Sequence, residues 1–167
     1  TVVDKDGVYR NTGLARVFNT EKEAITAIKS TDESQRLKAG EILILRCGGP
    51  LGTGMEEVYQ ITAALKHLSY GKRIALITDA RFSGVSTGAC IGHVGPEALA
   101  GGPIGRVREG DLIEILIDTK NLEGTINLVG TGDTNRGVDW GSSTLSQRVS
   151  PDSLSPHPMI PDDSRLW

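Results

Sequence analysis

The chain has 167 residues, of which 38% are hydrophobic and only 4% aromatic, and its formal net charge is −3. This composition indicates one domain, or one domain with a tail, around a core of mostly Ile, Leu, Val and Ala. The charge and the lack of a basic stripe argue against a nucleic-acid partner. The longest apolar runs, residues 42–45 and 74–77, are far too short to span a membrane.

Cysteine usage and the chain ends indicate the compartment and the kind of chain. Cys47 and Cys90 do not make a disulfide framework, and no secretory signal is visible, so we expect a cytoplasmic protein with reduced thiols. The chain opens at Thr1 without an initiating Met and stops at Trp167. We therefore expect it to be a piece of a longer protein.

The first elements are a strand region and a helix. Residues 8–18 alternate loosely between apolar and polar positions, which predicts one or two short strands. Thr20 and Glu23 have the spacing of a capping box, in which each side chain accepts a hydrogen bond from the other residue's backbone. The apolar stripe that follows predicts a helix ending near Ser30.

The middle of the chain predicts a strand–helix–strand unit. Residues 42–46 form an apolar strand that enters a glycine-rich loop, and residues 55–69 carry an apolar stripe typical of a helix. Residues 74–78 form the next strand. A helical crossover favours parallel pairing of the two strands, so the loops that leave them, residues 48–57 and 79–88, should face one cavity.

The second half predicts short strands and an irregular ending. Pro96 is expected to begin a single helical turn. Beyond residue 130 the composition shifts to Gly, Ser, Pro, Asp and Asn, which predicts an extended loop or tail over residues 131–167 after a domain of residues 1–130. Strands are expected at residues 91–94, 104–107, 111–117 and 125–129, with the second and third of these paired.

The loop after the first strand offers two carboxylates. Its glycine spacing fits neither a dinucleotide fingerprint nor a phosphate-binding P-loop. Glu56 and Glu57 fall in the first turn of the predicted helix, where they could simply complement the helix dipole. Alternatively, one of them points into the cavity as a metal ligand, because carboxylate oxygens suit magnesium.

The loop after the second strand carries the candidate reactive groups. Ser83 is either a turn serine that bonds its own backbone or a catalytic hydroxyl activated by a base or a metal. A G-x-S-x-G hydrolase elbow would need glycine where Arg81 stands, which disfavours a hydrolase. Arg81 could pair with Asp79 or hold a substrate carboxylate. His93 is either a structural residue or a donor to a substrate oxygen.

Two longer segments resemble a known family. Residues 79–84 (DARFSG) and 92–98 (GHVGPEA) resemble the signature of the dihydroxy-acid and phosphogluconate dehydratases. Residues 52–57 (GTGMEE) and 15–18 (ARVF) resemble further segments of that family, and the similarity runs over about residues 8–130. The ending, at residues 130–133 and 161–167, resembles the sugar-acid branch, particularly the D-xylonate dehydratases.

The resemblance implies the C-terminal domain of a larger hydro-lyase. Such enzymes remove water from a 2,3-dihydroxy acid to give a 2-keto-3-deoxy acid, with an iron–sulfur cluster as Lewis acid and Mg²⁺ at the carboxylate end. By motif position, Ser83 matches the family's base and Glu57 its magnesium ligand. Glu56 competes for the second role, since the family often has M-P-E where this chain reads M-E-E. The residues that we expect to contact substrate are Arg81, Ser86, Thr87 and His93.

The resemblance also implies a fold and partners. The fold is of the swivelling β/β/α type, an α/β domain with a barrel-like sheet arrangement flanked by helices. The cluster ligands are expected in an N-terminal domain and not at Cys47 or Cys90, whose spacing is more typical of buried structural thiols. We expect the full-length enzyme to be a homo-oligomer that acts on a small sugar acid, and this piece alone to be inactive. The rival interpretation is a stand-alone swivelling-type binding or interaction module.

Overall fold

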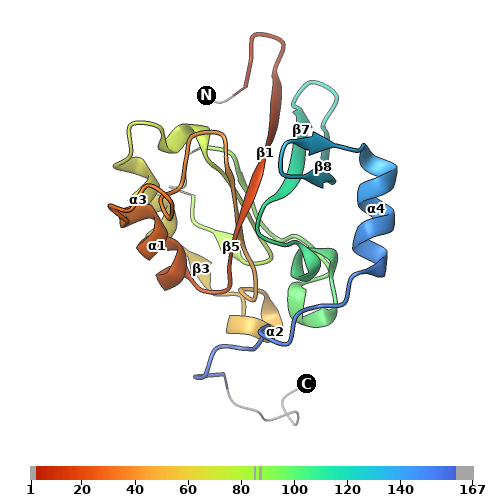
Figure 1. Cartoon of the computed structure of the whole chain (residues 1–167). Coiled ribbons are helices and arrows are strands. Elements are labelled where there is room, and N and C mark those ends of the chain that lie inside the picture. Colours follow the sequence, from red (N-terminus) through yellow and green to blue (C-terminus); the bar gives the residue numbers. More distant parts are fainter. Residues whose placement is uncertain (1–2, 85, 87, 161–167) are drawn as a thin grey trace.

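The computed structural model describes residues 3–84, 86 and 88–160, and a seven-stranded sheet is its centre (Figure 1). The strands of the chain are β1 (Val8–Phe18), β2 (Ile42–Leu45), β3 (Glu57–Val58), β4 (Ala75–Thr78), β5 (Arg81–Phe82), β6 (Cys90–Ile91), β7 (Asp111–Asp118), β8 (Glu123–Thr131) and β9 (Thr134–Asn135). The α-helices are α1 (Glu21–Lys29), α2 (Pro50–Thr53), α3 (Gln60–Lys66) and α4 (Val138–Gln147). Short 3-10 helices are η1 (Gly71–Arg73), η2 (Ala98–Ala100) and η3 (Pro103–Arg106).

The large sheet has a parallel half and an antiparallel half that meet at β1. Its strand order is β6-β4-β2-β1-β7-β8-β9, and β3 pairs with β5 in a separate ribbon. The end of β1, from Ala15 to Phe18, pairs in parallel with β2, while its beginning, from Val8 to Leu14, pairs antiparallel with β7. The predicted α/β class is confirmed, as is the parallel pairing of β2 with β4. The sheet is open, with β6 and β9 at its edges, and does not close into the barrel-like arrangement that we expected.

The parallel strands are buried on both faces, which explains their continuous apolar sequences. On one face Ile42 and Ile44 of β2 join a core cluster with residues of β4, β7 and β8. On the other face Leu43 and Leu45 pack with residues of α1 and α3. Alternate residues of β2 therefore pack into two separate cores. Helices α1 and α3 cover the second core (Figure 1).

The capping-box prediction for α1 is confirmed. Thr20 Oγ1 accepts a hydrogen bond from the Glu23 amide at 3.2 Å, and the Glu23 carboxylate accepts one from the Thr20 amide at 3.1 Å. The helix ends at Lys29, with Ser30 as its C-cap. Residues 8–18, predicted as one or two short strands, form one long strand. Its length lets it pair with two neighbours in succession.

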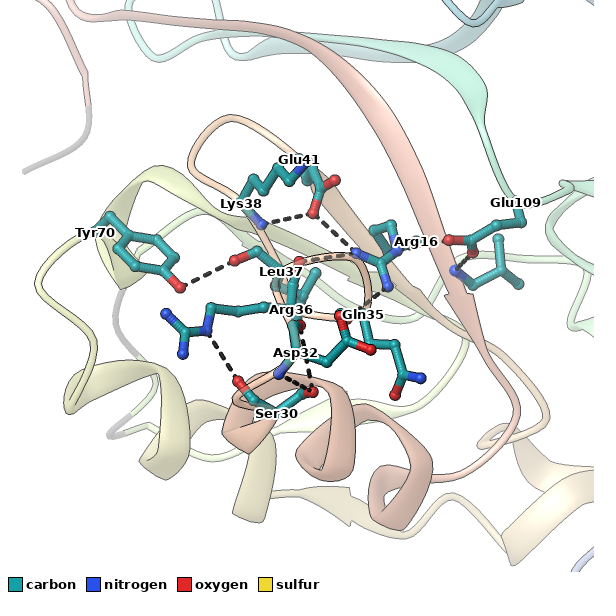
Figure 2. Close-up of polar contacts among 11 residues, drawn as sticks. Arg16, Ser30, Asp32, Gln35, Arg36, Leu37, Lys38, Glu41, Tyr70 and Glu109 are labelled. Carbon is teal, nitrogen blue, oxygen red and sulfur yellow. Dashed lines mark hydrogen bonds and ion pairs between the residues drawn. The ribbon is translucent and has the colours of Figure 1, made fainter.

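Arg16, from the ARVF segment, holds the long connection between α1 and β2 in place (Figure 2). Its guanidinium donates hydrogen bonds to the Gln35 and Arg36 carbonyls and lies within ion-pair distance of Glu41 and Glu109. The Arg16 Nη1–Glu41 Oε2 distance is 3.3 Å. The ARVF segment therefore has a structural role, because the Arg16 side chain satisfies backbone carbonyls of an otherwise irregular segment.

The predicted helix over residues 55–69 is wrong in its first turn. The helix α3 begins at Gln60, and the residues before it form the short helix α2 and the strand β3. Gly54 and Met55 have positive φ angles, 70° and 66°, which end α2 and prevent an immediate second helix. Glu57 therefore lies in a strand, so the interpretation that it complements a helix dipole does not hold.

Two further predictions about the second half need correction. Residues 104–107 were expected as a strand, but Pro103 starts the 3-10 helix η3, and β7 pairs with β1 and β8 instead. Residues 131–167 were expected as a loop or tail, yet they include α4, whose Trp140 and Leu145 pack against the core. In Figure 1 α4 (blue) lies beside β8. The proposed boundary at residue 130 stays a prediction.

Residues 149–160, which we call the C-terminal strap, follow α4 and run back below the sheet toward α2 (Figure 1). The residue that precedes the strap, Arg148, is fixed by a bidentate ion pair with the buried side chain of Asp111. Arg148 Nη2 donates to Asp111 Oδ1 at 2.8 Å.

Within the described residues, no helix is both long and apolar enough to cross a bilayer.

Candidate active site

Asp79 joins the loops that leave the parallel strands. It follows β4 and is 2% exposed. Its Oδ1 accepts a hydrogen bond from the Gly48 amide at 2.9 Å, and its Oδ2 accepts one from the Ala98 amide at 2.9 Å and one from the Cys47 amide at 3.3 Å. A single buried carboxylate thus ties together three segments that are far apart in sequence. The suggested Asp79–Arg81 pair does not form among the described residues.

The glycine-rich loop after β2 is tightly packed. A Cβ on Gly52 would lie 1.9 Å from the Cys47 carbonyl oxygen, so only glycine fits there. The Leu51 amide, at the start of α2, donates to the carboxylate of Glu97 at 3.0 and 3.1 Å. The carboxylate of Glu97 therefore occupies the start of α2.

The small ribbon of β3 and β5 brings the two candidate loops side by side. The strands run parallel, with Glu57 opposite Arg81 and Val58 opposite Phe82. Arg81 Nη1 lies 3.3 Å from Glu57 Oε2, and Arg81 Nε donates to the Met55 carbonyl at 2.9 Å. Both charged side chains remain partly exposed, Glu57 at 35% and Arg81 at 49%, so each is accessible to a ligand.

Ser83 comes directly after β5, one residue beyond Phe82, and it is half-buried. Its carbonyl accepts a hydrogen bond from the Ser86 amide at 3.2 Å, which makes a turn of this segment. The Ser86 hydroxyl is buried and has no hydrogen-bond partner among the described residues. Thr87, another expected substrate contact, lies outside the described residues.

His93 leaves the edge strand β6 in a left-handed backbone conformation. Its φ angle is 57°, and its amide donates to the Ala80 carbonyl at 2.8 Å. The backbone of this residue is therefore part of the loop scaffold, while its side chain is exposed. The role of the His93 side chain, structural or as a donor to a substrate oxygen, stays a prediction.

A cavity of about 400 Å³ opens between these loops and the start of α1. Its size suits a small organic ligand. The lining residues come from four places: Asn19, Thr20, Glu21 and Lys22 at α1; Leu45, Arg46, Cys47, Gly48 and Thr53 after β2; Glu56, Glu57, Val58, Gln60 and Ala80 around β3 and β5; and Ser155, Pro156, His157 and Pro158 of the strap.

The cavity only partly matches the sequence prediction. Glu57 lines it, but Ser83, Arg81 and His93 are not among the residues of its wall. The α1 start and the strap were missed. The strap carried no sequence signal for a site, because its Ser, Pro and His residues stood in a segment with the composition of a tail.

The two cysteines pack on different faces of the sheet. Cys47 belongs to the core cluster shared with β7 and β8, whereas Cys90 packs against the cluster under α1 and α3. Burial raises the pKa of both thiols, and the neighbouring Asp79 carboxylate raises that of Cys47 further. Groups on opposite faces cannot jointly ligate a cluster.

The carboxylates fit a partial metal site. No three His, Cys, Asp or Glu side chains gather at one point within the part of the chain that the structure describes. Glu57, accessible and facing the cavity, can supply one oxygen ligand. Magnesium is often held by one or two carboxylates together with water and substrate oxygens. Glu57 is therefore suited to complete a site whose other ligands come from elsewhere.

Comparison with known proteins decides the family. The model of the dihydroxy-acid/6-phosphogluconate dehydratase C-terminal family matches residues 1–149. The chain belongs to this family. The D-xylonate dehydratases YjhG and YagF of Escherichia coli are 55% and 54% identical to it over 100% of its length. Dihydroxy-acid dehydratase 2 of Bradyrhizobium diazoefficiens is 48% identical over 71% of it.

This dehydratase domain is one part of a larger architecture in those relatives. The chain spans 25% of the length of each D-xylonate dehydratase and 20% of the Bradyrhizobium protein. The family segments quoted above fall on β1, on the α2–β3 region, on β5 and on the turn after β6. Three of these four places adjoin the cavity or the β3–β5 ribbon, and the fourth, through Arg16, supports the fold.

Proposed function

We propose that the chain is the C-terminal domain of a hydro-lyase that dehydrates a D-xylonate-like sugar acid to a 2-keto-3-deoxy acid. The observation that carries the proposal is the β3–β5 ribbon, which sets Glu57 beside Arg81 and brings Ser83 directly after them. The identity of 55% to a D-xylonate dehydratase over the whole chain supports the substrate class.

In the proposed reaction Ser83 removes the proton from C2 of the substrate. The C3–O bond then breaks, the departing hydroxide takes up a proton and leaves as water, and the resulting enol tautomerises to the keto acid. A serine hydroxyl acts as a base only where a strong positive charge stabilises its alkoxide. When bound, Mg²⁺ and an iron–sulfur cluster supply Lewis-acid stabilisation of the carboxylate end and of the departing hydroxyl.

The remaining components are proposed to come from outside this chain. The cluster ligands and the other magnesium ligands belong to an N-terminal domain of the same enzyme. Arg81, Ser86, Thr87 and His93 are proposed substrate contacts. The full-length enzyme is a cytoplasmic homo-oligomer, and the C-terminal domain alone is inactive because it holds only part of the site.

The experiment compares Glu57→Gln with Glu56→Gln in the full-length enzyme. Formation of 2-keto-3-deoxy acid from D-xylonate is followed against Mg²⁺ concentration, and Mg²⁺ binding is measured by calorimetry. We expect Glu57→Gln to weaken binding at least about tenfold, because a neutral amide replaces a charged ligand. Glu56→Gln tests the competing ligand, since Glu56 also lines the cavity, and it should change the affinity little. Unchanged Mg²⁺ affinity in Glu57→Gln would remove Glu57 from the metal site.

A further inference from the structure

The C-terminal strap contacts the site through residues in its middle part. The Ser153 carbonyl accepts a hydrogen bond from Asn19 Nδ2 at 3.4 Å, and Leu154 packs against the core. Further along, the His157 amide donates to the Gly52 carbonyl at 2.7 Å. The strap is thus tied to the start of α1 and to the glycine-rich loop.

In this part the strap forms one wall of the cavity. Ser155 to Pro158 line it together with Glu57 and the start of α1. If Glu57 lies at the carboxylate end of the substrate, as proposed above, the rest of the acid extends along a cavity that the strap helps to enclose. The polar strap residues Ser155 and His157 are then neighbours of the distal carbons.

The comparisons separate the strap from the rest of the domain. The family match ends at residue 149, where the strap begins. Both D-xylonate dehydratases nevertheless align with the whole chain, strap included. The strap therefore lies beyond the residues that the family model matches, and two relatives named for a sugar acid align across it. A sugar acid differs from a dihydroxy acid with an alkyl tail in its additional hydroxyls.

The imidazole of His157 has a defined hydrogen-bonding state. The Met159 amide donates to its Nδ1 at 3.2 Å, so Nδ1 is an acceptor and the neutral ring carries its proton on Nε2. Nε2–H is then available as a donor. A polar group that pairs with a substrate hydroxyl discriminates strongly against an analogue without that hydroxyl.

We propose that His157 is a specificity-determining residue, which recognises a distal hydroxyl of the sugar acid from the strap. The inference rests on the proposed dehydratase function and adds to it a residue outside the part of the chain that the family model matches. Ser155 and the strap backbone set the position of the ring, while the chemistry itself remains with the β3–β5 side of the site.

The test combines enzyme variants with substrate analogues in the full-length protein. Wild type and His157→Ala are assayed with D-xylonate and with its 4-deoxy and 5-deoxy analogues. In wild type, kcat/KM should be at least about tenfold lower for one deoxy analogue, and His157→Ala should abolish that preference. His157→Gln, which retains an N–H donor, should restore part of it. Asp152→Ala, an exposed strap residue outside the cavity wall, should leave the preference intact.

Two outcomes would overturn the inference. An unchanged preference in His157→Ala means that the ring does not contact a distal hydroxyl. An equal loss of kcat/KM with all three acids means that His157 only supports the glycine-rich loop. Ser83→Ala, assayed in parallel, separates the two proposals: full activity there defeats the proposed function, whereas an inactive Ser83→Ala beside an unchanged preference in His157→Ala defeats only the role of the strap.

Discussion

At the scale of single residues, the decisive group is Asp79. Its two carboxylate oxygens accept hydrogen bonds from the amides of Gly48, Cys47 and Ala98. These amides belong to loops that no local interaction would hold together. Because the carboxylate is buried, each amide would lack a partner without it, and a buried unsatisfied donor costs about 1–3 kcal/mol. Asp79 therefore positions the loops from which the site is built.

We predict that Asp79→Asn destabilises the protein by about 2–3 kcal/mol, although the two side chains have nearly the same shape. The asparagine amide would present N–H groups toward backbone N–H groups and leave at least one of them unsatisfied. Urea unfolding measures the change. Asp152→Asn, at an exposed position, is the control and should be neutral within about 0.5 kcal/mol. Equal stability of the two variants would show that the Asp79 contacts contribute little.

The sequence indicated the importance of Asp79 but not its role. Its place at the end of an apolar strand was visible, as was its proximity to Arg81 along the chain. Asp79 lies between β4 and β5, and its buried carboxylate accepts hydrogen bonds from three backbone amides, so it does not pair with Arg81. Arg81 instead meets Glu57, 24 positions earlier, because β3 and β5 pair in register. Such partners depend on tertiary pairing and could not be found from spacing.

At the scale of elements, local signals succeeded where the determinants are local. The capping box predicted the start of α1, and continuous apolar runs predicted β2 and β4. The helix start at residue 55 failed because Gly54 and Met55 take left-handed conformations in a loop held by Glu97. The helix α4 was missed because its sequence, VDWGSSTLSQ, is poor in strong helix formers and is stabilised from outside.

The outside support of α4 can be tested at Arg148, the C-cap of the helix. Arg148→Met should destabilise the protein by about 3 kcal/mol, because Asp111 would remain buried without its cation. The rate of hydrogen exchange at the α4 amides should also rise in this variant. Arg136→Met, which removes only a ring contact with Trp140 at 5.3 Å, is the matched control, and we expect it to cost less than about 1 kcal/mol.

A double variant checks that the Arg148 effect comes from the ion pair. Combining Asp111→Asn with Arg148→Met removes both charges, so the loss should be clearly smaller than the sum of the two single losses. Additive losses would assign the effect to packing of the Arg148 side chain and not to its charge.

At the scale of the whole molecule, topology explains which part of the site was predictable. A helix between two apolar strands implied parallel pairing, and parallel pairing implied adjacent loops at one edge of the sheet. The third contributor, the C-terminal strap, reaches that edge from the far end of the chain through contacts with Asn19 and Gly52. Contacts between such distant segments leave no periodic signal in sequence.

The central claim is that Ser83 acts as the base in a site shared with Glu57, and one variant tests it. In the full-length enzyme, Ser83→Ala should lower turnover of D-xylonate by about a thousandfold or more, since the base that removes the C2 proton is lost. The visible absorbance of the cluster and the unfolding temperature should match wild type. Turnover within a few fold of wild type in this variant, with the protein folded and the cluster present, would contradict the account.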